Sequence, residues 1–216
     1  MGRVVIFKFS FLKEVFSRIH FWQQADRLGP DIPWSHWRLH FKSTMTALAT
    51  QKFRQFGAGA EFRPGAYAVN CSKIELGKRV VIRPGTMLFA DPQNAGGSIL
   101  IEDDVMLGSG VHIYVANHSF SDPNQPIINQ GHMPAKTVIL RRGCWIGANA
   151  IILAGVEVGK NSVVGAGSVV TKSIPSGMLA VGNPAKCIRN LNAKAYSNIE
   201  IGASRLLQSK NLFREV

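Results

Sequence analysis

The sequence has few cysteines, little that resembles a secretory signal and no apolar run long enough to cross a bilayer. Its three cysteines, Cys71, Cys144 and Cys187, are odd in number, far apart and without metal-ligand spacing, which favours a reducing, cytoplasmic compartment. A spanning helix needs about 20 apolar residues, and no stretch approaches that length. The apolar start is broken by Lys8 and Lys13 and lacks a small-residue cleavage site, so no secretory signal is expected.

Acidic residues are also scarce. The chain has 13 Asp and Glu against 25 Lys and Arg, a formal net charge of +12. This excess predicts an anionic partner, such as a nucleotide, a phosphate-bearing substrate or an acidic membrane surface, with a merely solvated basic surface as the alternative. Nucleic acid is not expected as a partner, because the chain has no recognised binding motif and its basic residues are spread over termini and turns.

A six-residue repeat is the strongest positive feature of the sequence. Aliphatic residues recur at intervals of six at Leu140, Ile146, Ile152, Val158, Val164 and Val170. Mostly small or β-branched residues recur four positions after each, at Cys144, Ala150, Val156, Ser162, Ser168 and Ile174. Helices and ordinary strands have periods of 3.6 and 2.0, so this pattern predicts a parallel β-helix of hexapeptide repeats rather than a β-sandwich or a doubly wound sheet with accidental spacing.

Three hexapeptides close one triangular coil, so residues 18 apart are expected to stack. Earlier coils are predicted at Ile101, Leu107 and Ile113, at Leu76, Ile82 and Leu88, and at Phe56, Phe62 and Ala68. Two interruptions, at 89–100 and 114–139, are too long for one face of a coil. They are expected to leave the prism as loops, where functional residues concentrate, and the longer one contains His118.

The predicted organisation is a helical N-terminal extension at 1–55, the β-helix with its loop at 56–189, and a helical tail at 190–216. Apolar residues at three- and four-residue spacing indicate one helix at about 11–27 and a second between Trp34 and Leu48, separated by Pro30 and Pro33. These helices are expected to cover the open end or side of the prism. The alternative is that this basic, aromatic segment lies on a membrane surface.

Between Ile101 and Arg189 the chain resembles the hexapeptide-repeat acyltransferases, through the strings NHSFSDPNQPI, GCWIGANAIILAGVEVG, VVGAGSVVTKSIP and GNPAKCIR. It is similar to the galactoside and maltose O-acetyltransferases and to the acetyltransferases of O-antigen and capsule biosynthesis. The resemblance implies a left-handed β-helix, a homotrimer with active sites between subunits, and acetyl-coenzyme A as the donor. No metal is expected.

The resemblance also assigns roles to particular residues. His118 matches the catalytic histidine, and Trp145 the tryptophan that opens the active-site coil. Six positions match or lie near the coenzyme site: Ala148 and Ala166 along the pantetheine arm, and Thr171, Lys172, Lys186 and Arg189 near the nucleotide end. Gly85 stands where sugar acetyltransferases carry an acceptor-binding asparagine, which argues against a simple galactoside or maltose acceptor.

The residue chemistry agrees with this assignment. Transfer of an acetyl group from a thioester to a hydroxyl needs a base, and histidine is suited to that task near neutral pH. The chain has no Gly-x-Ser-x-Gly elbow and no convincing cysteine nucleophile, so direct transfer is expected. Asp122 nearby and Asp91 farther away are the candidates for orienting His118.

The leading interpretation is therefore an O-acetyltransferase acting on a sugar of a surface polysaccharide such as lipopolysaccharide, or on its nucleotide- or lipid-linked precursor, in the cytoplasm at the inner face of the membrane. N-acetylation of an amino-sugar nucleotide and antibiotic acetylation are the related alternatives. A zinc-dependent γ-type carbonic anhydrase would need three histidines, and His112, His118 and His132 are the candidates, although six-residue spacing places the first two on successive faces. A non-catalytic scaffold is the last alternative.

Overall fold

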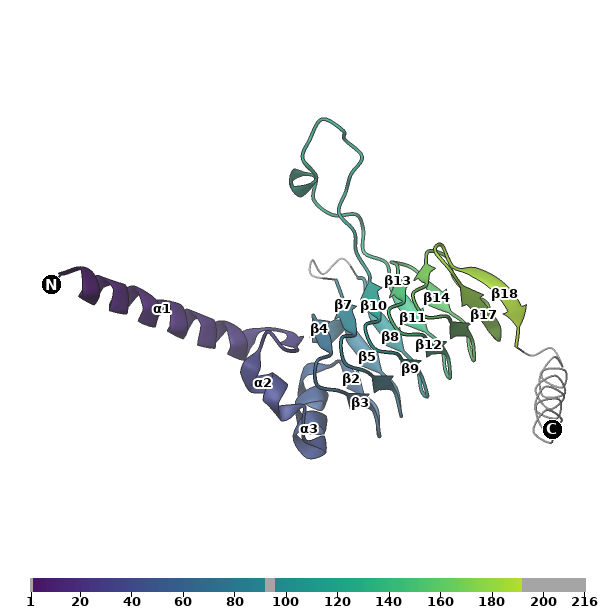
Figure 1. Ribbon diagram of the computed structural model, residues 1–216, viewed down its shortest axis with the longest axis horizontal. Coiled ribbons are helices and arrows are strands. Elements are labelled where there is room, and N and C mark those ends of the chain that lie inside the picture. Colours follow the sequence, from purple (N-terminus) through teal and green to yellow (C-terminus); the bar gives the residue numbers. More distant parts are fainter. Residues whose placement is uncertain (1, 92–95, 192–216) are drawn as a thin grey trace, which may run out of the picture.

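The computed structural model describes residues 2–91 and 96–191 of the chain. Three sheets form the faces of a left-handed parallel β-helix (Figure 1). Face A contains β4 (Tyr67–Val69), β7 (Met87–Phe89), β10 (His112–Tyr114), β13 (Ile151–Ile152) and β16 (Val169–Val170). Face B contains β2 (Gln55–Phe56), β5 (Ile74–Leu76), β8 (Ile99–Ile101), β11 (Val138–Leu140) and β14 (Glu157–Val158). Face C contains β3 (Glu61–Phe62), β6 (Val81–Ile82), β9 (Met106–Leu107), β12 (Trp145–Ile146), β15 (Val163–Val164), β17 (Met178–Val181) and β18 (Lys186–Asn190).

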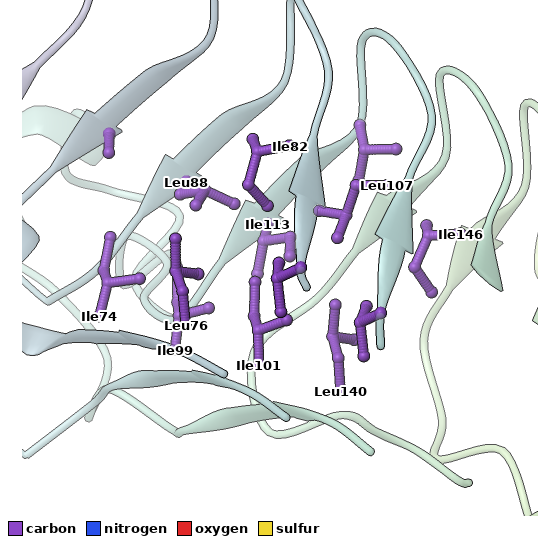
Figure 2. Close-up of a cluster of buried hydrophobic side chains, with 14 of the residues drawn as sticks. Ile74, Leu76, Ile82, Leu88, Ile99, Ile101, Leu107, Ile113, Leu140 and Ile146 are labelled. Carbon is purple, nitrogen blue, oxygen red and sulfur yellow. The ribbon is translucent and has the colours of Figure 1, made fainter. Parts of the chain in front are cut away.

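The predicted stacking register is confirmed on all three faces. On face C, Ile146 pairs with both Leu107 and Val164, and the other two faces follow the same rule. The earlier coils also stack as predicted. The aliphatic side chains point into the prism (Figure 2), where they are almost fully buried. Each coil therefore buries apolar surface against its neighbours, which is the main stabilising interaction of such a fold.

The second, smaller set of repeat positions also lies inside the prism. Cys144, Ala150 and Val156 are buried, and Ser162 and Ser168 fill the equivalent places in the last coil. The Ser162 hydroxyl donates to the Pro175 carbonyl at 2.7 Å and accepts from the Met178 N–H at 3.2 Å. Buried hydroxyls are tolerated when they are hydrogen-bonded, so these serines join the regular coils to the irregular segment that follows.

Every long excursion leaves the prism at the same edge, the turn from face A to face B, which we call the AB corner. The spacing from Ala68 to Leu76 is eight, from Leu88 to Ile101 is 13, and from Ile113 to Leu140 is 27, instead of six. The last of these is the loop 114–139, which projects from the side of the prism (Figure 1). At the other two edges the spacing stays at or near six residues, because the turns of successive coils stack on one another there.

The N-terminal end of the prism is covered mainly by α3 (Lys42–Lys52). Its buried Met45, Leu48 and Ala49 belong to the same core as Phe53 and Phe62. β1 (Arg27–Leu28) pairs antiparallel with β4 and closes the edge of face A. The prediction that the extension covers the open end of the prism is therefore confirmed for α3, which keeps the edge strands from pairing with other chains.

The remaining helices differ from the sequence-based prediction. α1 runs over Gly2–Gln24 rather than 11–27, because the chain after Ala25 joins face A as β1. The second expected helix is divided into α2 (Pro33–Arg38) and α3, with extended backbone at Phe41. Packing on the prism was the wrong prediction for most of α1, which projects from its end (Figure 1). No described helix is long and apolar enough to cross a bilayer.

The C-terminal end of the prism carries a β-hairpin that the repeat pattern did not predict. β17 continues face C in parallel with β15, and β18 returns antiparallel to β17. The main chain of the hairpin bonds to β16, with the Ala185 N–H donating to the Val169 carbonyl at 2.8 Å. The predicted C-terminal helix falls almost wholly in 192–216, outside the described residues.

The outer surface of face B is charged and links successive coils. Arg141 donates to Glu102 at 2.8 Å and to Glu157 at 2.8 and 3.1 Å. The hydrogen bonds from Arg141 hold the pKa of Glu157 below its usual value. Face B is thus suited to contact with water, and the predicted site residues lie elsewhere.

If the internal ladders are the main source of stability, truncating one member should be costly. Ile146→Ala removes buried methyl groups and leaves a cavity, so we expect a loss of about 2–5 kcal/mol in the free energy of unfolding. The same change at exposed Ile188 should alter it by no more than about 0.5 kcal/mol. Urea unfolding of the two variants measures the difference, and equal losses would contradict the assigned core.

Candidate functional site

His118 is held at the neck of the loop 114–139 by a short antiparallel ribbon. The Met133 N–H donates to the Asn117 carbonyl at 2.8 Å, and the Ser119 N–H donates to the Gly131 carbonyl at 3.0 Å. Nearer the prism, the Lys136 N–H donates to the Val115 carbonyl at 2.7 Å. These bonds extend regular pairing outward from the AB corner, so His118 lies on a supported ribbon rather than in an unsupported loop.

The side chain beside His118 is a second histidine. His118 and His132 form an antiparallel bridge, and their ring centroids are 4.3 Å apart with planes inclined by 32°. Both residues are exposed. Sequence reasoning missed this pairing, because 13 residues of loop separate them and nothing in that spacing indicates a ribbon.

The two carboxylates proposed to orient His118 have other identifiable contacts. Asp122 accepts a hydrogen bond from the Asn124 N–H at 2.9 Å and so stabilises a turn of the loop. Asp91 is buried, with Lys73 Nζ 3.8 Å from its carboxylate. In the described part of the chain, the observed ring neighbour of His118 is thus an imidazole.

The tip of the loop is closed by the Gln130 side chain. Its amide nitrogen donates to the carbonyls of Asp122 and Gln125 at 2.8 and 2.9 Å, and its amide oxygen accepts from the Asp122 N–H at 3.1 Å. The loop nevertheless exposes the apolar side chains of Phe120, Ile127, Ile128 and Met133. An ordered loop with exposed apolar groups is typical of a surface that contacts another molecule.

Trp145 points outward from face C, one position before the buried Ile146 on β12. Half of its surface is exposed (50%), and so is half of Met106 (51%), its partner in the preceding coil. Val163 and Leu179 extend the same outer column and are partly buried. The predicted tryptophan therefore belongs to an apolar stripe that runs along the prism axis.

Ala148 and Ala166 lie one above the other at the turn from face C to face A, which we call the CA corner. The Gly167 N–H donates to the Ala148 carbonyl at 2.8 Å. Gly147 allows this close stacking, because a Cβ there would lie 2.5 Å from the Ala166 nitrogen. Across residues 2–91 and 96–191, neither alanine N–H donates a hydrogen bond, so both are available to an extended ligand.

The four predicted nucleotide-end residues share the C-terminal end of the prism but come from two segments. Thr171 and Lys172 follow β16 at the AB corner, while Lys186 and Arg189 lie on β18. All four are exposed. This end of the prism thus presents cations, which suit phosphate groups.

One chain does not gather all the predicted residues. His118 leaves from the AB corner, Trp145 stands on face C, and Ala148 and Ala166 occupy the CA corner. Three sides of a triangular prism face in different directions, so this set cannot surround one small ligand within a single chain.

Gly85 also lies at the CA corner, with φ of 76°. This left-handed backbone conformation favours glycine, with asparagine as the next most tolerant residue. A Cβ at Gly85 would lie 3.3 Å from the Gly110 nitrogen. The position therefore presents bare main chain where the resemblance implies an amide side chain.

The geometry does not support a three-histidine metal site. His112 is on face A, where its Nδ1 lies 3.1 Å from the Tyr114 hydroxyl, apart from the His118–His132 pair on the loop. In the described ranges, no three His, Cys, Asp or Glu side chains gather as metal ligands. A cysteine nucleophile is also disfavoured at two positions. Burial raises the thiol pKa of Cys71 well above its usual value, and it raises the thiol pKa of Cys144 to about 12.

Parts of the sequence match a known family and known proteins. The family described as bacterial transferase hexapeptide (six repeats) matches residues 137–172. The galactoside O-acetyltransferase of Escherichia coli (strain K12) is 30% identical over 146 residues, 68% of each chain. The polysialic acid O-acetyltransferase of Escherichia coli O1:K1 / APEC is 40% identical over 125 residues, 56% of this chain but only 38% of that protein.

The fold comparison agrees with the sequence comparison. A galactoside acetyltransferase solved in complex with coenzyme A has a TM-score of 0.63 and 26% identity, covering 73% of this chain and 77% of that one. The repeat match, the shared sequence over two thirds of the E. coli protein and the shared prism all point the same way. The chain belongs to the hexapeptide-repeat acetyltransferases.

Proposed function

We propose that this protein transfers an acetyl group from acetyl-coenzyme A to a hydroxyl of a sugar, with His118 as the general base. The main support is that His118, an exposed histidine on a hydrogen-bonded loop, projects from a prism whose fold is similar to that of a galactoside acetyltransferase. Two O-acetyltransferases are also similar to the chain in sequence. A non-catalytic scaffold would have no need of that arrangement, although fold alone does not decide function.

In the proposed reaction, one imidazole nitrogen of His118 takes the proton of the acceptor hydroxyl as its oxygen attacks the thioester carbonyl. Backbone N–H groups are the donors suited to the oxyanion of the tetrahedral intermediate. Collapse of the intermediate breaks the carbon–sulfur bond, and the imidazolium returns its proton to the coenzyme thiolate. The products are the acetyl ester and free coenzyme A, and no acyl-enzyme is formed.

The donor is proposed to lie along the CA corner and the C-terminal end of the prism. The free N–H groups of Ala148 and Ala166 suit the amides of the pantetheine arm. Lys172, Lys186 and Arg189 suit the pyrophosphate and the 3′-phosphate, with Thr171 beside them. Trp145 lies on the neighbouring face and supplies an apolar wall.

The site is proposed to form between copies of the chain in a homotrimer. His118 and the two alanines lie at different corners of one prism, so a neighbouring subunit must bring the loop of one chain to the donor groove of the next. The exposed apolar side chains of the loop and the apolar stripe on face C supply surface for such an interface.

The acceptor is proposed to be a sugar of a surface polysaccharide such as lipopolysaccharide, or its nucleotide- or lipid-linked precursor. The positive charge suits an anionic acceptor. Gly85 lacks the amide expected for binding a simple galactoside. N-acetylation of an amino-sugar nucleotide and acetylation of an antibiotic remain the competing outcomes of an acceptor panel.

The central test is the loss of the base. His118→Ala and His118→Asn should each lower kcat by about 10²–10⁴-fold, because neither side chain takes a proton near neutral pH. Affinity for acetyl-coenzyme A should stay nearly unchanged. The assay follows coenzyme A release with a hydroxyl acceptor identified from a panel of sugars, amino-sugar nucleotides and antibiotics, and exposed His40→Ala is the control. Retention of more than about a tenth of wild-type kcat would assign proton removal to another group.

The donor assignment predicts a separate kinetic effect. Replacing Lys172, Lys186 and Arg189 together with glutamine should raise KM for acetyl-coenzyme A more than about tenfold, since charge-assisted contacts are worth about 1.5–3 kcal/mol each. The penalty should shrink for dephospho-coenzyme A if the 3′-phosphate is a partner. Lys78→Gln, an exposed lysine at the N-terminal half of the prism, is the matched control. An unchanged KM would place the nucleotide elsewhere.

An intersubunit site predicts a trimer that persists on dilution. Sedimentation velocity should give about three times the mass of the 23.6 kDa chain. Mixing the His118→Ala variant with the triple-glutamine variant should restore part of the activity, because some interfaces then combine two intact halves. A fully active monomer would contradict the shared site.

A further inference from the structure

The N-terminal extension exposes a set of aromatic and aliphatic side chains that neither the prism nor the proposed reaction uses. On α1, Leu12, Phe16 and Ile19 follow the i, i+4, i+7 spacing of one helix face and are all exposed. On α2, Trp34 and Trp37 are 81% and 65% exposed. Together with Phe11 and Phe41 these residues form what we call the aromatic surface.

The two helices contribute to one apolar groove. Ile19 and Trp22 of α1 face Ile32 and Trp34 across a groove that reaches Leu48 of α3. Among the described residues of its lining, the charged ones are both cations, Arg38 and Lys52, and the uncharged polar ones are Gln23, Ser35 and Gln51. A largely apolar groove whose charged residues are cations suits a molecule with an acyl chain and an anionic head group.

The charge of the whole extension has the same sign. Residues 1–55 contain nine Lys and Arg against three Asp and Glu. Lys13, Arg18 and Lys42 are exposed near the aromatic surface. Basic residues beside aromatic ones are typical of helices that lie at the boundary between head groups and acyl chains, and each basic residue near an anionic bilayer adds attraction.

A second copy of the chain is the other occupant that an exposed apolar helix face admits. Two such extensions carry the same excess of positive charge and repel each other, whereas an anionic bilayer attracts both. No described helix is long and apolar enough to span a bilayer, so a membrane contact of α1 would lie in the plane of the surface.

We propose that the aromatic surface binds the surface of an anionic phospholipid bilayer, with the side chains of α1 and α2 inserted at the level of the head groups. α1 projects away from the prism (Figure 1), which leaves the catalytic loop and the coils outside the lipid. The proposal goes beyond acetyl transfer and does not depend on it.

The full-length protein is tested by flotation with vesicles of phosphatidylcholine alone and of phosphatidylcholine mixed with phosphatidylglycerol, without donor or acceptor. Wild type should float with the anionic vesicles, at least tenfold more than with the neutral ones, and high salt should weaken binding. The double variants Phe16→Ser/Ile19→Ser and Trp34→Ser/Trp37→Ser should each lose tenfold or more. Ile188→Ser, at an exposed position on β18, should bind like wild type.

Tryptophan fluorescence provides a second measurement. Three of the four tryptophans, Trp22, Trp34 and Trp37, lie in the extension, and Trp145 lies on the prism. Lipids brominated along the acyl chain should quench most of the emission of wild type but not of Phe16→Ser/Ile19→Ser. Circular dichroism should show both double variants folded, because the replaced side chains are exposed.

Three results would overturn the proposal. The first is that wild type fails to float with anionic vesicles. The second is binding that the serine substitutions leave unchanged, which would make it a general charge effect. The third is a lower oligomeric state for the double variants in solution, with no change in flotation, which would assign the aromatic surface to a second copy of the chain.

Discussion

The stacking of aliphatic residues in successive coils is the constraint on which the rest of this structure depends. Each coil has little core of its own and gains its buried surface from the coils on either side. The side chains of Leu107, Ile146 and Val164 must therefore fall in line, and the turns between them must stack as well. A prism built this way is rigid along its axis, which gives projecting groups a fixed base.

Departures from the repeat are allowed only where stacking is not broken. All three insertions leave at the AB corner, and the chain then returns to pair in register. The CA corner, by contrast, has bare main chain at Gly85 and only methyl side chains at Ala148 and Ala166, whose N–H groups donate no hydrogen bond in the described part of the chain. The proposed base therefore lies at a corner that is extended outward, and the proposed donor groove at a corner that is kept narrow. This separation favours our proposal of a site shared between subunits.

The extension at the N-terminus has two different tasks. α3 buries Met45 and Leu48 against the first coil and so protects the open strand edges. On α1 and α2, Phe16, Trp34 and Trp37 are exposed to solvent, although the same apolar periodicity runs through all three helices. Periodicity indicates that a helix has an apolar face, but it does not indicate which partner covers that face. The partner is the prism for α3 and, in our proposal, a bilayer for α1 and α2.

The sequence by itself determined the coils. The six-residue period placed Ile101, Leu140 and Val158 in one ladder and located the loop 114–139. Stacking of the coils imposes this fixed spacing on the sequence, so the period can be counted directly along the chain. Only the tertiary structure decided the partner of His118, the split between α2 and α3, and the hairpin at β18. These features depend on contacts between segments that do not repeat. In such segments the number of residues between two positions does not predict how far apart they lie in the fold.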